Sequence, residues 1–181
     1  LVTMSDLLVQ HKEPLQAVIM AGGLGTRLRP LTDDLPKPML PVGDRPLLEI
    51  IVNQLKAADI HNISVSVNHQ AEKIEEYFGD GKSFGVDITN ATEDQPLGTA
   101  GALGLLDAPT ETTLVINGDI LSAVNLRAML AYHRENRAEL TVAVHHQDYQ
   151  MPYGVIECDG SMVTARKFPQ MVTIKSALLP D

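Results

Sequence analysis

Glycine, arginine and lysine are concentrated in one stretch near the N-terminus, residues 20–46, which reads MAGGLGTRLRPLTDDLPKPMLPVGDRP. Its first three glycines offer backbone N–H groups and let the backbone approach a phosphate group closely. Arg27 can bind two phosphate oxygens at once, and the prolines on either side of Lys37 keep that segment extended, so that its charge is presented. The residue types and their close spacing predict a phosphate-binding loop. The alternative is a glycine-rich turn with solvated charges.

The loop matches neither of two common phosphate-binding motifs. No Gly-x-x-x-x-Gly-Lys-Ser/Thr run occurs in the sequence, which excludes a P-loop. Gly23 and Gly25 begin a Gly-x-Gly-x-x-Gly pattern, but Leu28 occupies its third position and no helical pattern follows directly. A dinucleotide-dependent dehydrogenase is therefore disfavoured.

A second candidate group, Asp119, ends the run TTLVINGD at 112–119. A carboxylate at the carboxyl end of a strand can bind Mg²⁺ that bridges phosphates, although an Asp that caps a turn is the common alternative. His145 and His146 are adjacent, so in a strand they point to opposite faces and cannot easily bind one ligand. Cys158 is the only cysteine, which excludes an internal disulfide, and no Cys/His cluster has zinc spacing.

Alternating strand and helix patterns position these residues. Buried or alternating apolar runs predict strands, and apolar residues at helical spacing predict helices. The predicted strands cover 15–22, 63–68, 86–91, 112–119, 140–146 and the two halves of a hairpin within 154–168. The predicted helices cover 46–60, 70–81, 99–106 and 125–138.

This order of elements predicts an α/β fold, a Rossmann-like, doubly wound and mainly parallel sheet with helices on both faces. In such sheets, ligands bind beyond the carboxyl ends of the strands. The glycine-rich loop follows the first strand, and Asp119 follows a later one. We therefore expect both to lie at the same edge of the sheet.

Composition narrows the classes of partner. The net charge of −9 disfavours a broad nucleic-acid surface, so an anionic ligand must be held by local positive charge. No apolar run approaches the ~20 residues of a membrane span, and the N-terminus lacks a secretory-signal pattern, so we expect no membrane association and a cytoplasmic location. The sequence begins with Leu, and residues 1–14 are expected to be a linker or tail from an upstream domain.

Three motifs together resemble the sugar-1-phosphate nucleotidyltransferases, or nucleotide-sugar pyrophosphorylases, of the mannose-1-phosphate guanylyltransferase type. They are AGGLGTRLRPLTDDLPKPMLPVGDRP at 21–46, EDQPLGTAGAL at 93–103 and VINGDI at 115–120. The resemblance implies a nucleotidyltransferase domain over 15–181, with the nucleotide-diphospho-sugar transferase fold. It implies an enzyme that transfers a nucleotidyl group from a nucleoside triphosphate to a sugar 1-phosphate, with Mg²⁺ as cofactor and pyrophosphate as leaving group. The nearest members suggest GTP and mannose 1-phosphate.

The resemblance also implies roles for particular residues. Arg27 and Lys37 fall on the phosphate-binding arginine and lysine of the family, and Asp119 falls on one of two metal-binding aspartates that also lies near the sugar. Tyr153 and Gly154 match the segment that approaches the acceptor sugar. The residues expected to contact the nucleotide are Ala21, Gly22, Gly23, Gly25, Thr26, Gln95, Gly98 and Thr99.

The resemblance weakens after about residue 160. Where the family usually has a Glu-Lys-Pro segment, this chain has Lys167, Phe168 and Pro169, and the following IKSALLPD matches the next family strand poorly. The second metal-binding aspartate would lie beyond Asp181. Three readings stay open: a truncated or altered enzyme, a non-catalytic nucleotide-binding or regulatory domain of the same fold, or a rearranged C-terminal end. Truncation would expose sheet edges and so favour a homo-oligomer.

Overall fold

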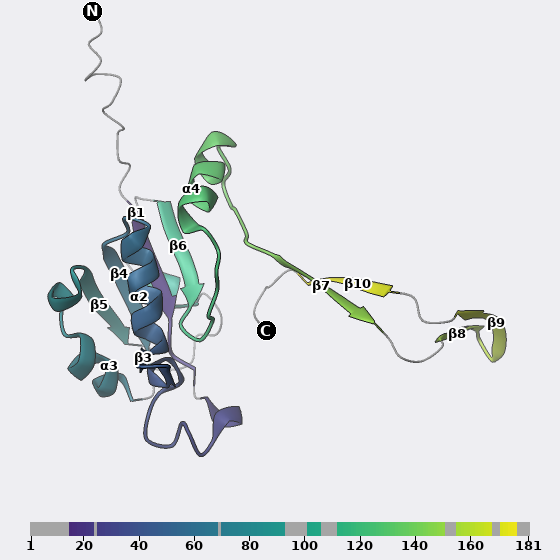
Figure 1. Ribbon diagram of the computed structural model, residues 1–181, viewed down its shortest axis with the longest axis horizontal. Helices are drawn as coiled ribbons and strands as arrows, with labels where there is room; N and C mark the ends of the chain where they lie inside the picture. The colour runs from purple at the N-terminus through teal and green to yellow at the C-terminus, as the bar shows by residue number, and fades with distance from the viewer. Residues whose placement is uncertain are drawn as a thin grey trace, which may run out of the picture. The chain divides into compact units, whose positions relative to one another are not determined.

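The computed structural model of the protein describes residues 15–23, 25–68, 70–92, 101–105, 112–150, 155–167 and 171–176 (Figure 1). The chain divides into two compact units, Leu1–Leu126 and Arg127–Asp181, and each is described by itself. Among the described residues, no helix has the length and apolar character needed to cross a bilayer.

A four-stranded sheet forms the centre of the first unit. Its strands are β1 (Leu15–Met20), β4 (Asn62–Val67), β5 (Asp87–Thr92) and β6 (Thr112–Asn117), in the order β5-β4-β1-β6. All neighbouring strands are parallel, and Met20 of β1 lies opposite both Ser66 of β4 and Asn117 of β6. The carboxyl ends of β4, β1 and β6 therefore meet at one edge of the sheet.

The two central strands carry the core because parallel strands covered on their faces need apolar side chains in both directions. The apolar residues of β1 and β4 that are almost fully buried are Ala17, Val18, Ile19, Ile63, Val65 and Val67. Helix α2 (Leu47–Ala57) lies over one face of the sheet (Figure 1). Its apolar residues recur at helical spacing, and four of them are fully buried: Leu48, Ile51, Val52 and Leu55.

The chain builds the sheet outward from β1 in two directions. It passes through α2 to β4, then through α3 (Ala71–Phe78) and a short 3-10 turn, η3 (Lys82–Phe84), to β5, and finally places β6 on the other side of β1. This reversal is the doubly wound topology, and the switch point lies between β1 and β6. The predicted α/β class with a parallel, doubly wound sheet is confirmed.

Short elements fill the long connection from β1 to α2. They are the 3-10 turns η1 (Thr26–Leu28) and η2 (Lys37–Met39) and the two-residue strands β2 (Pro41–Val42) and β3 (Arg45–Pro46), which pair as a hairpin. The helix expected over 99–106 contains a 3-10 helix, η4 (Gly101–Leu105), and the rest of that range lies outside the described residues.

The described residues of the second unit form one helix and two pairs of antiparallel strands. The helix is α4 (Leu126–Glu135), which begins at the boundary of the units. The paired strands are β7 (His145–Gln150) with β10 (Met171–Ser176) and β8 (Val155–Asp159) with β9 (Met162–Lys167). The hairpin expected within 154–168 is thus confirmed, with Gly160 in its turn at a positive φ of 58°.

The strand expected over 140–146 is wrong in its position. Residues 140–144 form no strand, and β7 begins only at His145. The first residue pair between β7 and β10 is His145 with Ser176, so β7 begins where β10 supplies backbone groups for hydrogen bonding. The apolar residues that suggested an earlier strand are exposed, Leu140 by 79% and Val144 by 66%. Apolar alternation alone does not make a strand without a partner.

Candidate active site at the switch point

The glycine-rich loop begins directly at the carboxyl end of β1. The N–H of Ala21 donates to the carbonyl of Ser66 on β4 at 2.9 Å, so the chain stays tied to the sheet for one residue beyond the strand. Gly23 follows and is exposed, and no described residue lies within 4 Å of the place where a Cβ would stand. Neither a strained φ nor a packing contact among the described residues requires glycine here. The absence of a side chain leaves open space beside the backbone.

Gly25 is glycine for two reasons inside the chain. Its φ of 62° lies in the left-handed region, which favours glycine, and a Cβ there would lie 2.9 Å from Cγ2 of Thr32. The same Cβ would lie 3.4 Å from Cβ of Lys37. The glycine loop and the lysine segment, twelve residues apart, therefore pack directly against each other.

Lys37 and Asp119 meet at the switch point. The Nζ atom of Lys37 donates to Oδ2 of Asp119 at 2.5 Å, although 82 residues separate the two in the sequence. Their side chains are 35% and 37% exposed, so the pair is open to solvent and to a ligand. The structure thus brings together two of the residues that the sequence predicted for catalysis.

Gly118 fixes the position of Asp119 and was missed by sequence reasoning. Its N–H donates to the carbonyl of Met20 at 2.8 Å, which joins the ends of β6 and β1. A Cβ on Gly118 would lie 3.1 Å from that same carbonyl oxygen and 3.2 Å from Cγ2 of Ile19. A side chain at residue 118 would therefore crowd the ends of β1 and β6, and glycine avoids this crowding. The signal was present in the VINGDI motif, as the glycine before the aspartate.

The other residues predicted for the site are placed less fully. Arg27 lies in η1 with an exposed side chain, on the same loop as Lys37 but in no described contact with it or with Asp119. Ala21, Gly22, Gly23, Gly25 and Thr26 all lie after the carboxyl end of β1, although Ala21 and Gly22 were expected to be the last two residues of the strand. Five predicted residues lie outside the described residues: Gln95, Gly98, Thr99, Tyr153 and Gly154. The role given to each residue stays a prediction.

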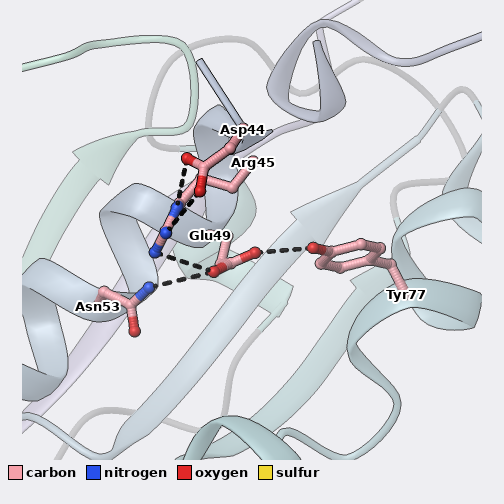
Figure 2. A network of polar contacts seen from close by, with 5 residues as sticks. All are labelled: Asp44, Arg45, Glu49, Asn53 and Tyr77. Atoms are coloured by element: carbon pink, nitrogen blue, oxygen red, sulfur yellow. Dashed lines mark hydrogen bonds and ion pairs between the residues drawn. The ribbon is translucent and has the colours of Figure 1, made fainter. Parts of the chain in front are cut away.

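A second polar cluster, here called the Glu49 network, lies on the β2–β3 turn, α2 and α3 (Figure 2). It consists of Asp44, Arg45, Glu49, Asn53 and Tyr77. The guanidinium of Arg45 donates to both carboxylate oxygens of Asp44, at 3.1 and 3.0 Å, and lies 3.5 Å from Oε1 of Glu49. The Tyr77 hydroxyl donates to Oε2 of Glu49 at 2.7 Å, and the Asn53 amide donates to Oε1 at 3.5 Å.

Titration in the Glu49 network follows from these contacts. The hydrogen bond to Glu49 raises the pKa of the Tyr77 hydroxyl above its ordinary value. The hydrogen bond from Arg45 lowers the pKa of the Asp44 carboxyl, and the same bond raises the pKa of the guanidinium. Each pKa shift favours the ionisation state in which the contact forms.

The carboxylates of the described residues form no cluster of three or more groups that could hold a metal ion. In the described part of the chain, Asp119 is the carboxylate that pairs with Lys37, and it lies at the carboxyl end of β6. Mg²⁺ is often bound by one or two carboxylates together with substrate phosphates and water. The oxygen chemistry of Asp119 therefore fits a magnesium ligand that acts together with a bound nucleotide.

Comparisons with known proteins place the chain among nucleotidyltransferases. The family model described as Nucleotidyl transferase matches residues 16–169. The chain is 37% identical to a mannose-1-phosphate guanylyltransferase of Mycobacterium tuberculosis over 80% of this chain and 41% of that protein. It is also 37% identical to a D-glycero-alpha-D-manno-heptose 1-phosphate guanylyltransferase of Aneurinibacillus thermoaerophilus, over 84% of this chain and 67% of the relative.

A solved structure from Bacillus anthracis, described as a candidate glucose-1-phosphate thymidylyltransferase in complex with a sucrose, shares the fold. Its TM-score is 0.66 and its identity 26%, over 90% of this chain and 69% of that one. The chain spans about half the length of the curated relatives that it matches, with shares of 41%, 67% and 44% for three of them. The match of the family model over 16–169, together with the resemblance of the three motifs, establishes that the chain belongs to the Nucleotidyl transferase family.

Proposed function

We propose that the protein transfers a nucleotidyl group from a nucleoside triphosphate to a sugar 1-phosphate. A phosphate oxygen of the sugar 1-phosphate forms a bond to the α-phosphorus of the triphosphate. The bond from that phosphorus to the bridging oxygen of the β-phosphate breaks, and pyrophosphate leaves with the electron pair. The products are a nucleoside diphosphate sugar and pyrophosphate, and no covalent enzyme intermediate is needed.

The observation that carries the proposal is the meeting of Lys37 and Asp119 at the switch point, where the glycine loop also packs against Lys37 at Gly25. Phosphoryl-type transfers depend mainly on positioning and on stabilising charge at the phosphate oxygens. The N–H groups of the loop and the ammonium of Lys37 supply positive charge for the triphosphate. The space beside Gly23 lets the phosphates approach the backbone.

Mg²⁺ is the cofactor that we propose for the reaction. When bound, the ion neutralises charge on the phosphate oxygens and orients them. Asp119 would supply a carboxylate oxygen, and the nucleotide and water would supply the remaining ligands. Lys37 pairs with the same carboxylate at 2.5 Å, so Asp119 would exchange this lysine for Mg²⁺ on binding, and the ammonium of Lys37 would then be available to the phosphates.

GTP and mannose 1-phosphate, or a related manno-configured sugar phosphate, are the substrates that we propose. Two relatives, each 37% identical to this chain, are named as guanylyltransferases of mannose 1-phosphate and of a manno-heptose 1-phosphate. One relative named as a UTP–glucose-1-phosphate uridylyltransferase is 34% identical, so the test of function includes UTP and glucose 1-phosphate.

The test is pyrophosphate release by the 181-residue chain, with GTP, ATP, CTP, UTP and dTTP each combined with mannose 1-phosphate and glucose 1-phosphate. We expect turnover with Mg²⁺ present, none after chelation, and the highest kcat/KM for GTP with mannose 1-phosphate. Nucleotide binding without pyrophosphate release from any pair would contradict the transferase proposal. It would support a non-catalytic nucleotide-binding domain instead.

A further inference from the structure

Thr32 is a buried polar residue that directly follows an exposed part of the loop. The residues from Thr26 to Leu31 are all exposed, whereas Thr32 is only 4% exposed. Its hydroxyl donates to the carbonyl of Gly25 at 2.9 Å, and the N–H of Leu28 donates to the same oxygen at 2.9 Å. This carbonyl has two lone pairs, and each accepts one donor.

The contacts of Thr32 join both segments that we expect to hold phosphate. Its methyl group lies where a Cβ on Gly25 would meet it at 2.9 Å, so the threonine fills the space that this glycine leaves. Cβ of Lys37 lies on the same side, 3.4 Å from that position. Gly25, Thr32 and Lys37 therefore form one packed unit, and the hydroxyl of Thr32 sets the direction of the peptide group that follows Gly25.

Asp33, the residue after Thr32, forms a hydrogen bond with the segment that joins β4 to α3. The side-chain amide of Gln70, which immediately precedes α3, donates to the carbonyl of Asp33 at 2.9 Å. Gln70 has a positive φ of 56°, and its Oε1 atom is buried without a hydrogen-bond partner in the described residues. The positive φ and the unpaired oxygen of Gln70 both cost free energy. Gln70 forms the hydrogen bond to Asp33 in spite of these costs. Through this bond, Gln70 at the start of α3 holds the backbone of Asp33, the residue next to Thr32.

We propose that Thr32 is a positioning residue for the triphosphate, which acts through Gly25 and Lys37 without touching the nucleotide. Its hydroxyl holds the carbonyl of Gly25 so that the neighbouring N–H groups face the ligand. The inference rests on the proposed function for the identity of the ligand. Preorganised donors bind phosphate better than donors that must first be ordered, because the ordering entropy is already spent.

The test separates the hydroxyl from the methyl group. Thr32→Val keeps the shape and removes the donor, whereas Thr32→Ser keeps the donor and removes the methyl. The control is Thr113→Val, because the Thr113 hydroxyl accepts a bond from Gln16 at 2.9 Å near the amino end of the sheet, far from the loop in sequence. Each variant is titrated calorimetrically with Mg²⁺ and the tightest binder of the five triphosphates, without sugar phosphate, so that no turnover occurs.

We expect Thr32→Val to weaken the triphosphate Kd by about tenfold, the effect of one lost hydrogen bond, with the binding stoichiometry of the wild type. Thr32→Ser should stay within about threefold of the wild-type Kd, and Thr113→Val should match it. A merely structural role would lower the stoichiometry, because fewer molecules fold, but would leave the Kd of the folded ones unchanged. Wild-type Kd in Thr32→Val, or equal weakening in Thr32→Ser, would overturn the inference.

A second variant covers the case in which Thr32→Val does not fold. Gln70→Met removes the donor to Asp33 and also the unpaired buried oxygen, so it should fold and weaken the Kd by about threefold. Wild-type Kd in that variant would contradict the inference.

The proposed function fails separately. If the wild type binds a triphosphate but releases no pyrophosphate, the proposed transferase activity is wrong, and the binding measurements on the Thr32 variants still test the role of Thr32. If the wild type binds none of the five triphosphates, both fall.

Discussion

Two polar clusters of the first unit differ in how fully their hydrogen-bonding groups are used. At the switch point, the three N–H donors of Lys37 meet one partner among the described residues, Asp119, and both side chains are more than a third exposed. In the Glu49 network, one carboxylate takes contacts from three side chains of the same unit, and Glu49 is only 15% exposed (Figure 2).

The difference separates a site from a scaffold. A network whose groups are already paired has little capacity for a ligand, and it serves to hold a turn against two helices. A pair with unused donors and exposed atoms can exchange its internal contact for a phosphate or a metal ion at little cost, because exposed ion pairs are worth only about 0–1 kcal/mol. Variants in the two clusters should therefore fail in different assays.

The largest expected effect is the loss of catalysis in Lys37→Met. The change removes positive charge from the triphosphate, and removal of one such preorganised donor commonly lowers kcat by about a hundred- to a thousandfold. The melting temperature should stay close to that of the wild type, because the pair with Asp119 is exposed. Steady-state pyrophosphate release and thermal unfolding measure the two effects.

The matched control is Lys82→Met, which breaks another exposed Lys–Asp pair, between Lys82 and Asp87. It should leave kcat/KM unchanged. Equal activity losses in both variants would show that Lys37 has no special role and would remove the contrast between the clusters.

A somewhat smaller effect is expected for Asp119→Asn. The amide keeps the size of the side chain but binds Mg²⁺ poorly and lacks the charge that holds Lys37. We expect turnover to fall by about a hundredfold and the enhancement of nucleotide binding by Mg²⁺ to disappear, measured by titrations with and without the ion. Asp87→Asn is the control, since Asp87 pairs with a lysine but lies on β5 at its amino end. Full Mg²⁺ dependence in Asp119→Asn would contradict the assignment.

The sheet and the pairing at the switch point were predictable from the sequence because both depend on local pattern and topology. A continuous apolar run such as AVI in β1 is typical of a parallel strand that is covered on both faces. In a parallel sheet, the glycine-rich loop and Asp119 both follow the carboxyl ends of strands and so lie at the same edge of the sheet. The sequence therefore predicted that Asp119 lies near the loop that carries Lys37.

Other features depend on contacts that no local pattern records. The position of β7 follows from its partner β10, which sequence reasoning did not identify as a strand. The burial of Thr32 and the bond from Gln70 to Asp33 depend on how the loop folds back on itself. The local sequence Leu-Thr-Asp-Asp does not distinguish Thr32 from an ordinary polar loop residue, because its bond to the carbonyl of Gly25 depends on the folded loop.

In the scaffold cluster, Glu49→Leu should lower stability and spare catalysis. The carboxylate loses its contacts with Arg45, Asn53 and Tyr77, and we expect the free energy of unfolding to fall by about 1–2 kcal/mol. The kcat and KM of the folded protein should stay within about twofold of the wild type. Urea denaturation gives the first quantity, with Glu76→Gln on the exposed face of α3 as control. A catalytic defect without destabilisation would reverse the roles of the two clusters.

The smallest effect is expected for Tyr77→Phe, which removes one hydrogen bond to Glu49 at a site where the ring is 42% exposed. The loss in unfolding free energy near pH 7 should be about 0.5–1 kcal/mol, because solvent compensates part of the bond. The pKa of the Tyr77 hydroxyl is raised by that bond, so its contribution is fully present below the unfolded pKa of about 10 and is lost as pH rises through the folded pKa. The difference between wild type and Tyr77→Phe should therefore be constant from about pH 7 to 9 and shrink above about pH 10. Tyr132→Phe, at an exposed tyrosine outside the network, should show no difference at any pH, and a Tyr77→Phe curve that matched it would mean that the bond to Glu49 contributes nothing to the scaffold.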